Sequence, residues 1–239
     1  MTELQPSPDA QPTVWRALLK RIALVLVVFL VMGILLFLPA GRLDWPAAWI
    51  LSALYAVFLL IYAVWGTLKA PELLHERSRV AENVKAWDKI LMTIYTILLL
   101  ATLPLAGLDV GRFRWSAMPL AWQWLGLAGL FLAGGLLFWT ILTNAYLGRW
   151  VRIQKDRGQQ VITGGPYHYV RHPMYLGIIV LFPGMTLFLG SWWALVPAGL
   201  IAILMVIRTV LEDRTLQAEL SGYAEYAQET RYRLLPGVW

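Results

Sequence analysis

Long runs of apolar residues alternate with short polar segments along this chain. The apolar runs cover residues 22–39, 46–66, 90–107, 122–142 and 174–210. A helix needs roughly 20 apolar residues to cross a bilayer, so each of the first four runs fits one span. The last run is too long for one span, and the small residues Gly190 and Ser191 interrupt it. We expect a tight hairpin there, and about six transmembrane helices in all.

Helices are the expected form of these spans. Backbone N–H and C=O groups in lipid must pair internally, and the runs lack the alternating apolar and polar positions of membrane barrel strands. Composition agrees with this interpretation, because 59% of the residues are hydrophobic and only 14% are charged. Ordinary soluble domains are less apolar and more highly charged. The sequence therefore predicts an all-α integral membrane protein.

Positive charges fall unevenly between the polar segments. One side of the predicted membrane region carries only Arg42, Arg112 and Arg114. The other Lys and Arg residues lie in the N-terminal segment, in residues 67–89 and 144–172, or from Arg208 onward. Because cytoplasmic segments are enriched in Lys and Arg, we expect both termini in the cytoplasm, as in a protein of a bacterial-type inner membrane. The net charge of +6 then reflects topology, and no nucleic-acid partner is expected.

The pattern divides the chain into three regions. Residues 1–20 begin as a polar segment rich in proline, which indicates a disordered cytoplasmic tail. Residues 21–110 are expected to form an N-terminal membrane region of three spans, and residues 111–239 a second membrane region. The charged residues within 67–89 alternate in sign, as in an interfacial helix. The alternative is a wall over a cytoplasmic pocket, with His75 and Trp87 facing that pocket.

A polar and aromatic segment, residues 165–177, adjoins the last apolar run. Its Arg171 and His172 stand at the edge of a span, where ionisable residues are functional candidates. Pro173 disfavours helical conformation at His172, so we expect an extended approach to a helix that begins near the proline. Gly164, Gly165 and Pro166 are expected to form a tight turn just before it.

The final hairpin should return the chain to the face that it left. Arg208 and Glu212 are then expected close to Arg171 and His172. Because Arg208 and Glu212 are four residues apart, they share one helical face, either as a simple ion pair or as a clamp for a ligand.

Two other patterns favour structural roles. Gly126, Gly129, Gly134 and Gly135 lie within an apolar run with no strand before them, so close helix packing is expected instead of a dinucleotide-binding loop. The chain has no cysteine and three histidines, and His168 and His172 do not fall on one helix. We therefore expect no metal site.

The C-terminal part of the chain, residues 144–239, carries a specific combination of residues. This combination is Gly165-x-Tyr167-x-x-x-Arg171-His172-Pro173-x-Tyr175-x-Gly177, followed by Glu212-Asp213, Tyr223-x-x-Tyr226, Arg233 and Pro236. It resembles the isoprenylcysteine carboxyl methyltransferase and phospholipid methyltransferase family. The resemblance implies that residues 111–239 form a membrane-embedded catalytic region. It also implies a cytoplasmic pocket for S-adenosyl-L-methionine, closed by the helical C-terminal tail, and a lipophilic methyl acceptor that arrives from the lipid bilayer.

The resemblance also implies roles for particular residues. The positions that match cofactor-binding residues are Gln154, Gln159, Gln160, Val161, Ile162, Tyr167, Arg171, His172, Pro173, Met174, Tyr175 and Glu212. Arg208 matches an arginine near the acceptor, so Arg208 and Glu212 are the candidate catalytic residues. A prenylcysteine-type carboxylate acceptor would need Arg208 to orient it. A lipid-like amine would need a base such as Glu212 or His172, and a hydroxyl acceptor is a further possibility.

Two other functions remain open on the sequence alone. A sterol-type membrane reductase that uses NADPH has a similar C-terminal region. A membrane scaffold or permeation protein without catalytic activity is the other alternative.

Overall fold

A computed structural model of the protein describes residues 10–78 and 84–239, and its regular structure in these ranges is entirely helical. The longer helices are α1 (Ala10–Ala40), α2 (Pro46–Lys69), α4 (Ala86–Gly107), α5 (Leu120–Thr143), α6 (Pro173–Leu189) and α7 (Leu195–Glu219). Short helices are α3 (Pro71–Ser78), α8 (Tyr223–Glu229), the π-helix η1 (Leu108–Phe113) and the 3₁₀ turns η2 (Lys155–Arg157) and η3 (Gly165–His168). The predicted all-α fold is confirmed.

The long helices match the apolar runs of the sequence. Among the described residues, α1, α2, α4, α5 and α7 are long and apolar enough to cross a membrane. Helix α6 is also apolar but has only 17 residues. The protein is therefore an integral membrane protein with five such helices in the described part, and a sixth span through α6 stays a prediction.

The N-terminal boundary differs from the expectation. Residues 10–20, which we expected in a disordered tail, lie in α1. Val14, Trp15 and Leu19 extend the apolar pattern of this helix, and their side chains are exposed on its surface. Pro12 lies in the first turn, where a missing N–H costs little. The rest of the expected tail, residues 1–9, lies outside the described residues.

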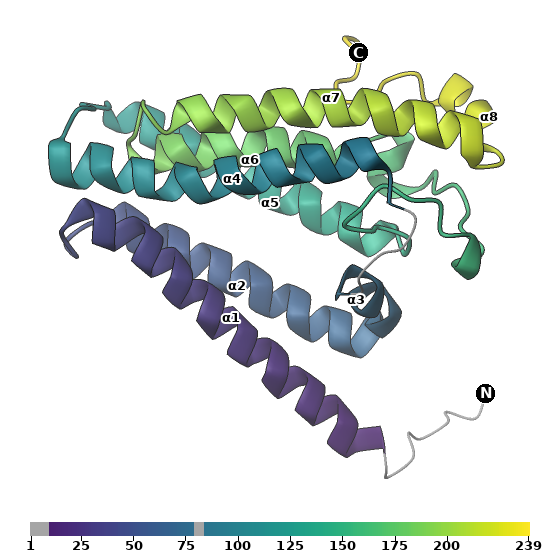
Figure 1. Ribbon diagram of the computed structural model, residues 1–239, viewed down its shortest axis with the longest axis horizontal. Coiled ribbons are helices and arrows are strands. Elements are labelled where there is room, and N and C mark those ends of the chain that lie inside the picture. The colour runs from purple at the N-terminus through teal and green to yellow at the C-terminus, as the bar shows by residue number, and fades with distance from the viewer. Residues whose placement is uncertain (1–9, 79–83) are drawn as a thin grey trace.

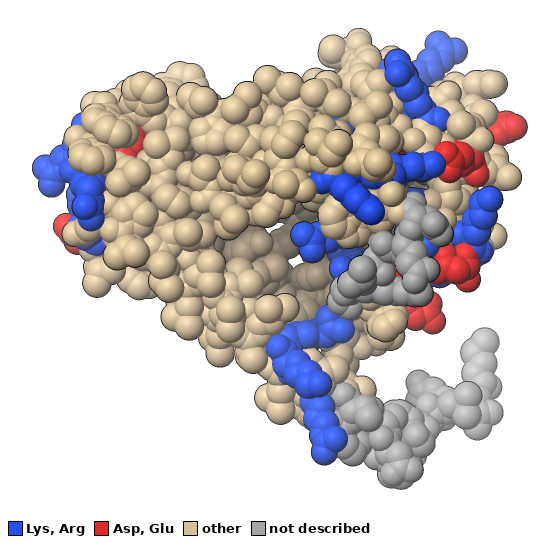
Figure 2. Space-filling model, viewed as in Figure 1, with Lys and Arg blue, Asp and Glu red and all other residues tan. Residues whose placement is uncertain are grey.

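Helices α4 to α7 run side by side as a bundle, and α1 and α2 form an inclined hairpin that meets this bundle at one end (Figure 1). Figure 2 shows charged side chains mainly at the two ends of the visible face, with a broad uncharged band between them. Helix α3 lies at the same end as α8. The arrangement therefore gathers the polar segments between helices at that end.

Proline and glycine mark the ends of the C-terminal helices. Pro173 is the first residue of α6, and His172 before it is not helical, with φ −126° and ψ 60°. Gly190 ends α6 in a left-handed conformation with φ 86°, which a side chain would disfavour. The predicted hairpin break at this position is confirmed.

A buried carboxylate fixes this turn. Asp109, in η1, accepts hydrogen bonds from the hydroxyls of Ser116 (2.6 Å) and Ser191 (2.5 Å). The Ser191 hydroxyl in turn accepts from the N–H of Ala194 at 3.0 Å, at the residue before α7 begins. The turn between α6 and α7 is therefore tied to the end of α4.

Helices α5 and α6 pack closely through glycine. A Cβ atom on Gly126 would lie 2.4 Å from the Phe188 backbone nitrogen and 2.6 Å from the Gly184 carbonyl oxygen. Gly129 also faces Gly184, at an ordinary contact distance of 3.6 Å. Gly134 and Gly135 would meet nothing within 4 Å. The prediction of close packing is thus confirmed for the first two glycines and wrong for the last two, which face away from α6.

We expect Gly126→Ala to destabilise the protein by about 1–3 kcal/mol, because the new methyl group overlaps backbone atoms that cannot move aside. Thermal unfolding in detergent measures the loss as a lower midpoint. Gly135→Ala is the matched control on the same helix, and we expect an equal or slightly higher midpoint, since alanine favours a helix more than glycine does. Equal midpoints for the two variants would contradict the close approach of α5 and α6.

Candidate functional site

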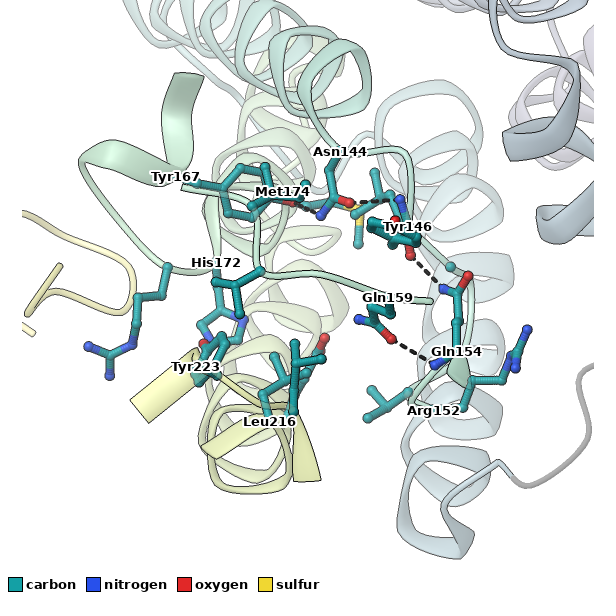
Figure 3. A pocket seen from close by; sticks show the side chains of 18 of the residues that line it. Asn144, Tyr146, Arg152, Gln154, Gln159, Tyr167, His172, Met174, Leu216 and Tyr223 are labelled. Atoms are coloured by element: carbon teal, nitrogen blue, oxygen red, sulfur yellow. Dashed lines mark hydrogen bonds between the residues drawn. The ribbon is translucent and has the colours of Figure 1, made fainter. Parts of the chain in front are cut away.

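A cleft opens at the end of the bundle where α3 and α8 lie (Figure 3). It encloses about 830 Å³ of empty space, including space open to solvent. Its walls come from residues 144–162, the start of α6, the C-terminal half of α7, and α8. Small-molecule sites are typically concave and combine apolar or aromatic side chains with a few polar groups, as this lining does. Every residue that the sequence predicted for the cofactor, and Arg208 beside them, lies in the lining of this cleft.

The segment 144–162 has little regular structure, and side chains hold its shape (Figure 3). Asn144 Nδ2 donates to Tyr167 Oη at 2.8 Å, and Gln154 Nε2 donates to the Tyr146 carbonyl at 2.6 Å. The Gln159 side-chain oxygen accepts from the backbone N–H of Gln154 at 2.7 Å. Both glutamines line the cleft while bonding to the segment itself, so they shape its wall.

Helix α3 supports this segment from outside. The buried Glu76 carboxylate forms an ion pair with Arg152 at 2.5 Å, and Arg152 also pairs with Asp156 at 2.9 Å. Arg77 donates to the Leu147 carbonyl at 3.3 Å. Helix α3 thus braces a wall of the cleft.

The two residues expected to face the cleft from this region, His75 and Trp87, do not line it. Their sequence neighbours Glu76 and Asp88 do not line the cleft either, but they bond to Arg152 and to the Val151 N–H in its wall. On a helix, neighbouring residues point in different directions, so adjacent positions make different contacts.

Asp213 on α7 accepts several hydrogen bonds in the interior. Its carboxylate receives Arg171 Nε at 2.8 Å and Nη2 at 3.0 Å, Arg233 Nε at 2.9 Å and the Tyr223 hydroxyl at 3.0 Å. His172 Nε2 lies 3.3 Å from the same carboxylate. Asp213 itself is fully buried. A charge in such a position is stable only when paired and hydrogen-bonded, and here both conditions hold.

The C-terminal segment closes over these residues. The backbone N–H groups of Arg171 and His172 donate to the carbonyls of Tyr232 and Arg233, both at 2.9 Å. Arg171 Nη1 donates to the Thr230 carbonyl at 2.8 Å. The segment after α8 is therefore fixed against the residues that precede α6.

Arg208 lies in the lining but is not a free cation. Its Nε and Nη2 donate to both oxygens of Asp88 on α4, at 2.8 and 3.2 Å. Nη2 also donates to the Arg149 carbonyl at 3.0 Å, and Asp88 accepts from the Val151 N–H at 2.8 Å. The pair therefore joins α4, α7 and the 144–162 segment.

Glu212 is one helical turn from Arg208 and also lines the cleft. Its carboxylate accepts a hydrogen bond from the Tyr175 hydroxyl. The Tyr175 ring in turn lies 5.2 Å from the Arg208 guanidinium. No Lys, Arg or His of the described ranges forms an ion pair with Glu212, so the simple Arg208–Glu212 pair is not formed.

Tyrosine hydroxyls near the cleft stay protonated. Burial raises the pKa of Tyr223, and the neighbouring Asp213 charge raises it further. Burial raises the pKa of Tyr226 to about 12, and its hydroxyl donates to the Tyr167 carbonyl at 2.6 Å. Burial also raises the pKa of Tyr167, although the hydrogen bond from Asn144 opposes this. The hydroxyls of Tyr223 and Tyr226 therefore act as hydrogen-bond donors at neutral pH, whereas that of Tyr167 accepts from Asn144.

The sequence did not predict several of the residues that line the cleft. Asn144, Tyr146, Arg152, Leu216 and Leu220 line it, as do Tyr223 and Tyr226. The two tyrosines belonged to the pattern that suggested the family, which was a usable signal. The loop residues gave none, because their contribution depends on how an irregular segment folds.

Comparison with known proteins agrees with this location. Residues 122–221 match the phospholipid methyltransferase family. The cobalt-zinc-cadmium resistance protein CzcN of Cupriavidus metallidurans is 34% identical to this chain over 133 residues. That match covers 54% of this chain and 57% of the relative, so the chain spans little more than half the length of that protein. The matched region contains the 144–162 segment, α6 and α7. The resemblance to this family that the sequence indicated is therefore confirmed over residues 122–221.

Proposed function

We propose that this protein is an S-adenosylmethionine-dependent methyltransferase of the membrane, which acts on a lipophilic acceptor. One observation carries the proposal. Most of the lining of the cleft falls in the segment that matches a methyltransferase family, and the lining includes all the residues that resemble cofactor-binding positions.

The residues of the cleft suit the groups of this cofactor. Its ammonium and ribose hydroxyls need acceptors, and the Glu212 carboxylate and the glutamine side chains supply such atoms. Its adenine needs an apolar and aromatic surface, which Val161, Ile162 and Leu216 can provide together with tyrosines of the lining.

The charge of the cleft distinguishes this cofactor from a phosphate-bearing one. The arginines in the lining, Arg152, Arg171 and Arg208, each form an ion pair with a carboxylate behind the wall. A nicotinamide dinucleotide carries phosphates that require cationic partners. A ligand with positive charge fits the cleft better, which favours the methyltransferase over the NADPH-dependent reductase.

Methyl transfer depends on positioning of the two reactants and does not require covalent catalysis by the protein. S-adenosylmethionine, when bound, supplies a methyl group already activated on a sulfonium, so no nucleophilic side chain is required. The braced walls of the cleft would align the acceptor and exclude water, and good alignment can contribute about 7–11 kcal/mol. Glu212 is the candidate proton acceptor for an amine, because His172 is already engaged with Asp213 and Tyr223. Arg208, bonded to Asp88, helps to shape the site.

The setting supports a lipophilic acceptor. On the face shown in Figure 2, the surface is hollowed between the α1–α2 hairpin and the rest of the molecule. A hydrophobic molecule in the bilayer would meet such a hollow without crossing water. The distribution of Lys and Arg supports placing the cleft on the cytoplasmic side of a bacterial-type inner membrane.

Calorimetric titration of the detergent-solubilised protein with S-adenosylmethionine tests the proposal. We expect saturable binding, and no comparable binding of NADPH. Binding of NADPH alone would favour the reductase. Binding of neither, with the helical circular dichroism intact, would leave only the scaffold or permeation function.

Glu212→Gln removes the charge of the proposed cation-binding carboxylate and keeps its shape. We expect roughly 10- to 100-fold weaker S-adenosylmethionine binding, the loss typical of a hydrogen bond to a charged group. Glu225→Gln is the matched control, because Glu225 is exposed on α8 and outside the lining. Equal affinities for the two variants would refute the role of Glu212.

Asp213→Asn leaves Arg171 buried beside a neutral partner. Loss of one partner of a buried ion pair costs about 3–5 kcal/mol, so we expect a clearly lower unfolding midpoint and faster proteolysis beyond residue 219. The control is Asp44→Asn, which removes an exposed ion pair with Arg42 and should leave the midpoint unchanged. A midpoint for Asp213→Asn equal to that of the control would contradict the buried network.

A further inference from the structure

Two carboxylates near Tyr175, Asp88 and Glu212, are possible partners of a single arginine, Arg208. Arg208 and Glu212 lie on the same face of α7, and both contact Tyr175, one over the ring and the other at the hydroxyl. An arginine four residues before a glutamate is within reach of it on the helix surface, although this order of charges is the weaker one. Arg208 instead donates to Asp88 through two nitrogens.

Asp88 is well placed to hold the arginine. Its side chain is fully buried, and the Arg208 side chain is 5% exposed. The Val151 N–H also donates to Asp88, and the Arg149 carbonyl accepts from Arg208. A buried pair with these additional hydrogen bonds is fixed in direction, because any rotation would leave polar groups without partners. Arg208 is therefore bonded to Asp88 and does not form an ion pair with Glu212.

Asp88 lies in α4, outside the segment 122–221 that matches the family. We propose that Asp88 is a positioning residue that sets the charge of the cleft. By neutralising Arg208 it leaves the Glu212 carboxylate available for a positively charged ligand. The proposal rests on the proposed function, and it adds a residue outside the matched region.

The charge of the cleft should affect how tightly it binds the methyl donor, S-adenosylmethionine, relative to the product, S-adenosylhomocysteine. Methyl transfer breaks the bond from carbon to sulfur and forms a bond from carbon to the acceptor, and the electron pair of the broken bond stays on sulfur. A cationic sulfonium thereby becomes a neutral thioether. A cleft with an unpaired carboxylate binds the cation more tightly, so the wild-type protein should bind S-adenosylmethionine more tightly than S-adenosylhomocysteine.

Asp88→Asn tests the proposal in the full-length protein. It keeps the size of the side chain, removes its charge and frees Arg208 to pair with Glu212. We expect both affinities to be measurable and that for S-adenosylmethionine to fall by a factor on the order of ten more than that for S-adenosylhomocysteine. The reason is that the site loses the attraction of one unpaired carboxylate for the sulfonium, and solvent partly screens this attraction. Calorimetric titration with each ligand at one ionic strength gives the ratio of affinities.

A second substitution separates charge from structure. In the double variant Asp88→Asn with Arg208→Met, both charges are gone, and the ratio should return toward that of the wild type even if the protein is less stable. Asp109→Asn is the matched control, because Asp109 is also a fully buried carboxylate but stands by the turn between α6 and α7, outside the lining of the cleft. It should lower stability and leave the ratio unchanged.

The outcomes distinguish the two proposals. If the wild type binds S-adenosylmethionine but shows no preference over S-adenosylhomocysteine, the charge-setting role is overturned while the proposed function stands. The same holds if Asp88→Asn leaves the ratio unchanged, or if the double variant keeps the altered ratio. If Asp88→Asn fails to fold, the ratio of the two affinities in the wild type and in the double variant still tests the charge-setting role. A wild type that binds neither ligand refutes the proposed function itself.

Discussion

The buried carboxylate of Asp213 is the interaction on which the arrangement of the site depends. It gathers Arg171, Arg233 and Tyr223 around one residue of α7, and so draws the start of α6, α8 and the C-terminal segment together. Each of these segments alone carries polar groups that would be costly next to a membrane span. Their mutual pairing satisfies those groups and forms one wall of the cleft.

The opposite wall of the cleft is also held by buried or largely buried carboxylates, with different partners. Glu76 holds Arg152, and Asp88 holds Arg208 and the Val151 N–H, so α3 and α4 fix an irregular segment that could not hold its own shape. Because each arginine of the lining is paired, the cleft presents its glutamate instead of a cluster of cations. The stability of the site and the proposed preference for a positively charged ligand thus have the same physical origin.

Short-range features of the sequence made the helices and several residues of the site predictable. The apolar runs gave the helices because a bilayer allows few other structures. Pro173 and Gly190 gave the limits of α6, since each fixes or permits a backbone conformation. Arg171, His172 and Glu212 could be placed together because a hairpin returns the chain to the face that it left. The N-terminal limit of α1 was misjudged, because prolines suggested a tail where the apolar pattern had already begun.

The sequence by itself determined the membrane setting, the helices and the residue types available to the cleft, because these follow from short-range periodicity and composition. Only the tertiary structure decided which charges pair. Asp88 and Arg208 are 120 positions apart, and Glu76 and Arg152 are 76 apart, so no local pattern links them. Arg208 turns to Asp88 and away from the nearby Glu212 because the low-dielectric interior favours the partner that satisfies the most hydrogen bonds.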